Sequence, residues 1–160
     1  MIQGTIKSNI EAYLQTEDNR IDTGVTTSQI GHLVKFTNDM DKSVQYAYAT
    51  LEMFKERYNY FFFTYHATPD VYTGKIDLKP AGYWKYEVYE VSWQGTRTIS
   101  EGNAPITETQ VLTPAADDKG VVQGLVTKGK MYLAEYPGQE QVQYTQREEP
   151  SGTNYIYYGQ

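Results

Sequence analysis

The sequence has no cysteine among its 160 residues, which excludes disulfide bonds, thiolate metal sites and cysteine nucleophiles. It also lacks any apolar run near the roughly 18 residues that a membrane-spanning helix needs. Residues 1–14 show no basic leader followed by an apolar stretch, so we expect no signal peptide. These absences predict a soluble chain with no membrane partner.

Positive charge is scarce and scattered. The formal net charge is −6, the sequence pI is near 4.9, and Lys128 and Lys130 form a tight basic pair. Because an acidic chain repels phosphate, we expect no nucleic-acid partner.

Aliphatic residues are also few, and tyrosine takes their place. Hydrophobic residues make up 39% of the chain, and 16 tyrosines supply most of its aromatic content. Tyrosine buries a ring while its hydroxyl stays solvated or hydrogen-bonded. This composition suits thin β-sheets and polar protein–protein contacts better than a large apolar core.

Alternation of polar and apolar residues predicts β-strands from residue 29 onward. The alternating segments are 31–39, 44–53, 58–65, 71–78, 82–91 and 121–136, whereas residues 52–57 (EMFKER) are also compatible with one helical turn. Short strands about ten residues apart, with few helix signals, are typical of a sandwich. We therefore predict an all-β fold, an antiparallel Ig-like β-sandwich over residues 28–136.

One predicted strand is apolar on both faces. Residues 58–65 place Tyr58, Tyr60 and Phe62 on one side, and Phe61 and Phe63 on the other. Such a strand is either buried between two layers or covered by a partner.

Three segments do not fit the sandwich pattern. Residues 1–27 are polar, and we interpret them as one N-terminal edge strand or arm with a loop. Residues 100–120 form a long excursion with two prolines, and loops of this length are usually functional or disordered. Residues 137–160 cannot make a core and are predicted to be a tyrosine-rich arm that orders against a neighbour; a frayed terminus is the alternative.

The loop and the arm carry the residues that we expect at an interface. Those in the loop are Ile106, Val111 and Leu112, and those in the arm are Tyr144, Tyr155, Ile156, Tyr157 and Tyr158. Aromatic residues, tyrosine among them, are enriched at protein interfaces.

The segment LKPAGYWKYEVYEV, residues 78–91, predicts a corner followed by a strand. We assign its bulkier face, with Trp84, Tyr86 and Val88, to the core. A tyrosine corner, in which a hydroxyl bonds back to the preceding backbone, would use Tyr83 or Tyr86. The predicted corner residues are Leu78, Pro80, Gly82, Tyr83, Trp84 and Tyr86. A sugar-binding platform is the alternative, but it needs the aromatic residues together on one exposed face.

The sequence offers little catalytic chemistry. His32 and His66 lack metal-binding spacing, and Glu87 and Glu90 fall on opposite strand faces, so they cannot act as a pair. The stretch NDMD, residues 38–41, resembles a calcium loop but fits a hairpin turn better. We predict no catalytic, cofactor-binding or metal residues and no enzymatic activity; a small β-sandwich hydrolase is the outlying alternative.

Several motifs in order along residues 29–145 resemble those of small tailed-phage virion structural proteins with an Ig-like β-sandwich. The matching residues are Phe36, Asn38 and Asp39; Arg57, Tyr58, Asn59 and Phe61; Gly82 to Glu90; and Gly129 to Met131. Segments 1–27 and 100–120 fit this pattern less well.

The resemblance implies a non-enzymatic subunit of the virion, assembled in the host cytoplasm. The expected role is a connector or adaptor ring at the neck or tail, with copies of itself and other virion proteins as partners and no cofactor. The alternatives are a capsid decoration protein, or a carbohydrate- or receptor-binding module on a fibre, which would expose Trp84 or Trp93.

Overall fold

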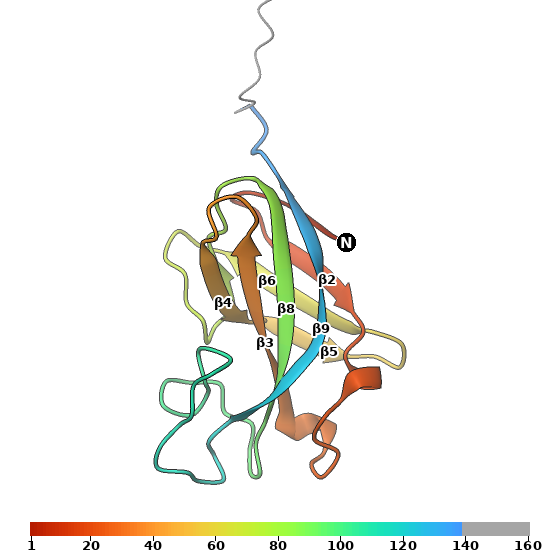
Figure 1. Ribbon diagram of the computed structural model, residues 1–160, viewed down its shortest axis with the longest axis vertical. Coiled ribbons are helices and arrows are strands. Elements are labelled where there is room, and N and C mark those ends of the chain that lie inside the picture. The colour runs from red at the N-terminus through yellow and green to blue at the C-terminus, as the bar shows by residue number, and fades with distance from the viewer. Residues whose placement is uncertain (139–160) are drawn as a thin grey trace, which may run out of the picture.

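The computed structural model describes residues 1–138, which form two β-sheets packed as a sandwich (Figure 1). Sheet A has the strand order β1 (Ile2–Thr5), β9 (Val121–Ala134), β8 (Gly82–Ser92), β3 (Ile30–Asn38) and β4 (Val44–Tyr48). Sheet B has the order β2 (Ile10–Leu14), β6 (Asn59–Tyr65) and β5 (Leu51–Phe54), with β7 (Lys75–Ile76) beside β6. The predicted all-β sandwich is confirmed.

The two sheets are mixed rather than purely antiparallel. β1 runs parallel to β9, with Ile2 opposite Met131, and β7 runs parallel to β6. The other strand pairs are antiparallel. Because β1 and β9 lie at distant points of the sequence, no short hairpin constrains their relative direction.

The N-terminal segment contributes two strands where one was predicted. β1 lies at an edge of sheet A, and β2 lies at an edge of sheet B. The turn between them contains Lys7 with a positive φ of 58°. Residues 17–19 and 27–29 form short 3₁₀ turns that lead into β3. The segment therefore closes one side of the sandwich.

Residues 44–54 also differ from the prediction of one strand followed by a helical turn. The stretch is divided into β4 in sheet A and β5 in sheet B, so the chain changes sheets at Ala49 and Thr50. The backbone of Thr50 bonds to Phe62 in β6, and its hydroxyl bonds to the carbonyl of Gly74. Contacts with distant residues therefore override the local alternation.

The main core lies between the sheets. Trp84, Tyr86 and Val88 point inward from β8, which confirms the face assigned from the sequence. The rings of Phe36 in β3 and Phe63 in β6 meet edge to face at 5.3 Å, joining the two sheets. Aromatic pairs of this geometry add to the stabilisation from buried area alone.

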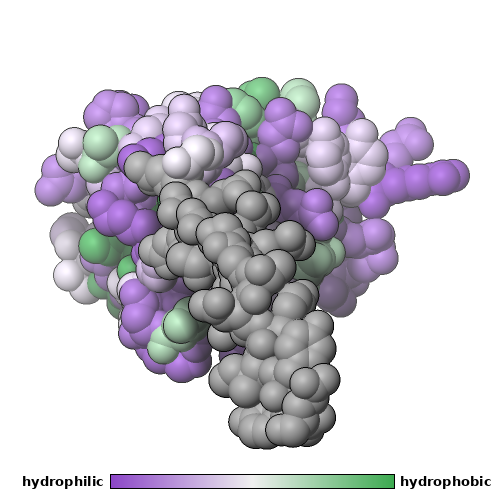
Figure 2. All heavy atoms as spheres, turned by 90° about the horizontal axis from the view of Figure 1, so that it is seen from above, coloured by the Kyte–Doolittle hydropathy of each residue, from purple (hydrophilic) through white to green (hydrophobic). Residues whose placement is uncertain are grey.

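The long loop and the end of β9 lie at opposite ends of the molecule. The connection from β8 to β9 spans residues 93–120 and lies at the lower end in Figure 1, whereas β9 rises from it to Ala134 near the upper end. At about 3.3 Å per residue, the 14 residues of β9 span roughly 45 Å. Figure 2 shows a mostly hydrophilic surface at the upper end, with separate hydrophobic patches. The predicted arm residues Tyr144, Tyr155, Ile156, Tyr157 and Tyr158 lie outside the described residues.

Candidate functional site

The corner before β8 is held by a tryptophan. The indole Nε1 of Trp84 donates to the carbonyl of Pro80 at 3.0 Å, while Leu78 is buried beneath. Tyr83 lies on the exposed face, where its ring packs against Tyr132 at 5.2 Å. Within residues 1–138, neither Tyr83 nor Tyr86 donates the bond expected of a tyrosine corner. The chain turns at the predicted corner, but the hydrogen-bond donor that holds it is the indole of Trp84 and not a tyrosine hydroxyl.

The loop begins at Trp93, which is fully buried, rather than at Ser100. Its backbone N–H donates to the carbonyl of Gln29, and its indole N–H donates to the carbonyl of Asn103 at 3.1 Å. The same carbonyl accepts from the backbone N–H of Gly120 at 2.8 Å. The loop thus closes on itself around the indole ring.

The loop covers the lower part of the outer face of sheet A, where it forms a second apolar cluster. The buried members are Leu33, Tyr48, Val91, Trp93 and Ala104. The hydroxyl of Tyr48 donates to the carbonyl of Pro105 at 2.6 Å, and burial raises the pKa of this tyrosine. The excursion is therefore a folded element of the molecule.

A polar contact fixes the middle of the loop. Glu108 accepts a hydrogen bond from Lys35 Nζ at 2.6 Å and another from the hydroxyl of Tyr46. Burial works to raise the pKa of Glu108, but these two bonds outweigh it, so its pKa is lowered. Burial, followed by the bond to Glu108, raises the pKa of Tyr46 to about 12. Charge-assisted bonds of this kind are stronger than neutral ones.

The apolar loop residues predicted at an interface differ in exposure. Val111 is 83% exposed, Ile106 is 38% exposed, and Leu112 is half-buried. Val111 and Leu112 line a hollow of about 180 Å³ together with Ala115 and Ala116. The loop backbone is held at Trp93 and Glu108, and the loop exposes Val111 largely and Ile106 in part to solvent.

The two histidines have structural surroundings. His32 is buried on β3 and bonds through Nδ1 to Glu52 on β5, so the pair joins the two sheets. Arg97 lies 3.7 Å from the other oxygen of Glu52 and donates to the carbonyl of Ile30 at 2.7 Å. His66 is exposed and bonds to Thr68. Both positions agree with the sequence interpretation of a satisfied or surface histidine.

The carboxylates of Glu87 and Glu90 lie on opposite faces of β8, as predicted. Glu90 points inward and accepts from the backbone N–H groups of Ile21 and Asp22 at 3.0 and 2.8 Å, whereas Glu87 lies on the outer face. In the 38–43 turn, Asn38 Oδ1 accepts from the backbone of Met40 and Asp41, the pattern of a hairpin turn. Across residues 1–138 no three His, Asp or Glu side chains are grouped to hold a metal ion.

Sheet pairing brings together lysines that are scattered in the sequence. The outer face of sheet A places Lys85 opposite Lys130, and Glu87 opposite both Lys35 and Lys128. Lys35 and Lys85 have carboxylate partners, whereas Lys128 and Lys130 have none within the described part of the chain. Cross-strand register could not be read from the sequence, so this basic face was missed.

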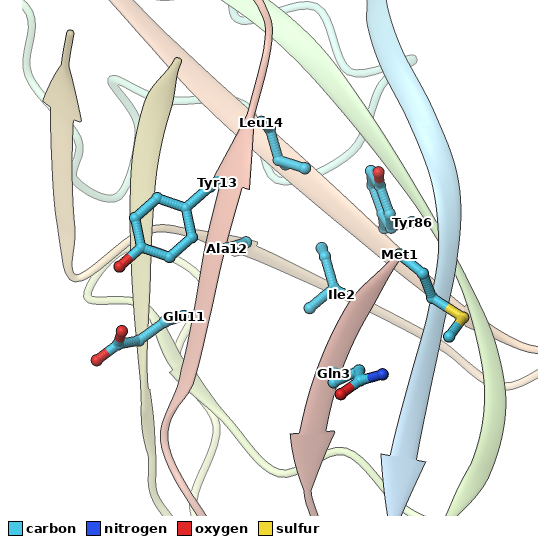
Figure 3. Close-up of a pocket in the computed structure, with 8 residues that line it drawn as sticks. All are labelled: Met1, Ile2, Gln3, Glu11, Ala12, Tyr13, Leu14 and Tyr86. Carbon is cyan, nitrogen blue, oxygen red and sulfur yellow. The ribbon is translucent and has the colours of Figure 1, made fainter. Parts of the chain in front are cut away.

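A groove opens between the two sheets beside β1 and β2 (Figure 3). Its volume is about 320 Å³, and it is lined by Met1, Ile2, Gln3, Glu11, Ala12, Tyr13, Leu14 and Tyr86. Ile2, Ala12 and Leu14 are buried, whereas Tyr13 is exposed at the rim. The groove is lined by polar as well as apolar groups, since Gln3 and Glu11 contribute to it beside Ile2 and Leu14.

Neither tryptophan is available for sugar stacking, since Trp84 and Trp93 are 2% and 0% exposed.

None of the helices in the described range has the length and apolarity to cross a membrane. No protein-family model matches the chain, and neither the curated proteins nor the solved structures contain a significant match. The site that stands out is therefore the anchored loop, with its apolar side chains exposed.

Proposed function

We propose that this chain is a non-enzymatic structural subunit of a bacteriophage particle. It acts as a connector or adaptor subunit in a ring at the neck or tail, and it assembles through the 93–120 loop and the C-terminal arm, residues 137–160. Its partners are copies of itself and other virion proteins. The Ig-like assignment of the sandwich and the virion location belong to the same proposal.

The observation that carries this proposal is the anchored loop with exposed apolar residues. Its backbone is fixed around Trp93 and Glu108, while Val111 and Ile106 face solvent. A rigid loop loses little conformational entropy when it binds, so its apolar side chains contribute more fully to association. The loop and the start of the arm lie at opposite ends of the long axis, an arrangement that suits subunits joined to different neighbours (Figure 1).

The sequence motifs at residues 36–39, 57–61, 82–90 and 129–131 support the phage assignment. Capsid decoration remains the nearest alternative, since it uses the same assembly chemistry. A carbohydrate- or receptor-binding module gains no support from the tryptophans, because both are buried.

Deletion of residues 137–160 tests the role of the arm. All strands described in the two sheets end by Ala134, so the shortened chain is expected to keep the far-ultraviolet circular dichroism spectrum of a β protein. Its incorporation into particles, measured by quantitative gel analysis of purified virions, is expected to be lost. A matched control is the substitution of Met40, an exposed residue in the 38–43 turn, by serine, which should leave incorporation unchanged. Normal incorporation of the shortened chain would show that the arm is not the attachment element.

A further inference from the structure

The outer face of sheet B is mostly apolar and aromatic. Cross-strand pairing sets Tyr60 between Tyr13 and Met53, and the next row sets Phe62 between Leu51 and the exposed Glu11, which places one charge at the edge of the face. The ring of Tyr13 also packs against those of Tyr58 and Tyr60, at 5.5 and 5.2 Å. We define the sheet B face as Tyr13, Leu51, Met53, Tyr58, Tyr60 and Phe62.

Nothing in the described chain covers this face. Tyr13 is 61% exposed, Leu51 is 47% exposed, and Met53 and Tyr58 are also exposed. The opposite side of β6 places Phe61 and Phe63 in the core, whereas Tyr60 and Phe62 on the outer side are half-buried, so the strand is apolar on both sides and fully buried on one. Contiguous exposed apolar residues on a sheet are a candidate interaction surface, and the choice of partner depends on the size of the face.

The size of the face indicates what kind of partner it fits. Three strands about 4.8 Å apart, paired over four or five residues, give a surface of roughly 14 by 17 Å, or about 240 Å². A stable interface between two proteins buries about 800 Å² on each partner. Two copies meeting through this face alone would fall well short, whereas one extended segment of about six residues, roughly 20 Å long, matches its length.

The C-terminal sequence supplies a segment of matching chemistry. Residues 153–158 read TNYIYY, with three tyrosines and one isoleucine, which are residue types that pack well on a pleated surface. The 22 residues after Gly138 reach at most roughly 75 Å when fully extended. β9 belongs to sheet A, and the sheet B face points away from it on the other side of the sandwich (Figure 1). The reach of these 22 residues includes the sheet B face of the same copy as well as that of a neighbour, so the choice of a neighbouring copy rests on the assembly function proposed above.

We propose that residues 153–158 of one copy dock on the sheet B face of a neighbouring copy. This inference rests on the proposed assembly function and names the surface that receives the arm. The aromatic rings of Tyr13, Tyr58 and Tyr60 flank the docked segment, and Leu51, Met53 and Phe62 form its apolar floor.

The absence of native cysteine makes disulfide trapping a direct test. One full-length variant carries Leu51→Cys, a second carries Ile156→Cys, and the two are mixed and oxidised at rising concentration. A disulfide-linked dimer of the two variants is expected. The matched control is Val44→Cys, because Val44 has the same 47% exposure as Leu51 but lies on β4 of sheet A. Trapping at Leu51 should exceed trapping at Val44 by roughly tenfold, the effect of an anchor contact worth about 1.4 kcal/mol.

Two results would overturn the docking proposal. One is equal trapping at Leu51 and Val44; the other is a chain carrying both Leu51→Cys and Ile156→Cys that links only within itself. A second variant, Leu51→Lys, is expected to reduce incorporation into particles by roughly tenfold, with Val44→Lys as control. If trapping fails while deletion of residues 137–160 still abolishes incorporation, the arm is needed for assembly but does not dock on the sheet B face. If the deletion leaves incorporation unchanged, the arm is not the attachment element, and the proposed assembly function fails with it.

Discussion

Replacing Trp93 by alanine is expected to lower the free energy of unfolding by about 3–5 kcal/mol and to release the 93–120 loop from the sandwich. The indole ring is fully buried, and it occupies the space between Gly31 and Gly120. A Cβ added at Gly120 would lie 2.7 Å from the ring, which shows how closely the returning chain packs on it. The substitution by alanine leaves a cavity in place of the ring, and both this contact and the hydrogen bond to Asn103 are lost.

The loss is measured by urea denaturation together with hydrogen exchange of the loop amides. Trp93→Phe is the matched control, because it keeps an aromatic ring but loses the N–H donor, so its effect should be smaller. We expect amides in residues 94–120, such as that of Gly120, to exchange faster in Trp93→Ala while those of β6 change only with global stability. A destabilisation below about 1 kcal/mol with unchanged loop exchange would contradict the assignment of Trp93 as the anchor.

Gly74→Ala is expected to lower the free energy of unfolding by about 2–5 kcal/mol, the sum of a left-handed backbone cost and an overpacking cost. Gly74 has a φ of 73°, and a Cβ there would lie 2.2 Å from the backbone nitrogen of Thr50 and 2.7 Å from the carbonyl oxygen of Tyr48. These are backbone atoms at the point where the chain passes from sheet A to sheet B, so no side chain can move to relieve the contact.

Gly102→Ala separates the two costs. Gly102 has nearly the same φ, 76°, but nothing lies within 4 Å of the added Cβ. Gly102→Ala should therefore lower the free energy of unfolding by only the backbone cost of about 1–2 kcal/mol. Equal losses for the two variants in urea denaturation would show that the close approach to Thr50 is unimportant.

Local alternation predicted the central strands well. The inward face of β8 and the extent of β3, β6 and β9 follow from residue types that alternate with period two. The burial of Trp84 and the hairpin turn at Asn38 could also be predicted from the sequence, because each depends on residues close by along the chain.

Features that depend on residues distant in the sequence could not be predicted from the sequence. The parallel pairing of β1 with β9 joins residues more than 120 positions apart, and the division of β4 from β5 depends on the approach of Gly74 to Thr50. The basic face of sheet A and the rows on sheet B appear only when strand register is known. The apolar character of β6 on both faces was the one signal in the sequence that pointed to the sheet B face.

Electron imaging of purified phage particles that contain this chain tests the structural-subunit proposal most directly. The proposal predicts density for the sandwich in a ring of copies at the neck or tail, with the 93–120 loop against a neighbouring protein. Regularly spaced density over the capsid surface would favour decoration instead. Absence of the chain from purified particles would contradict the proposal.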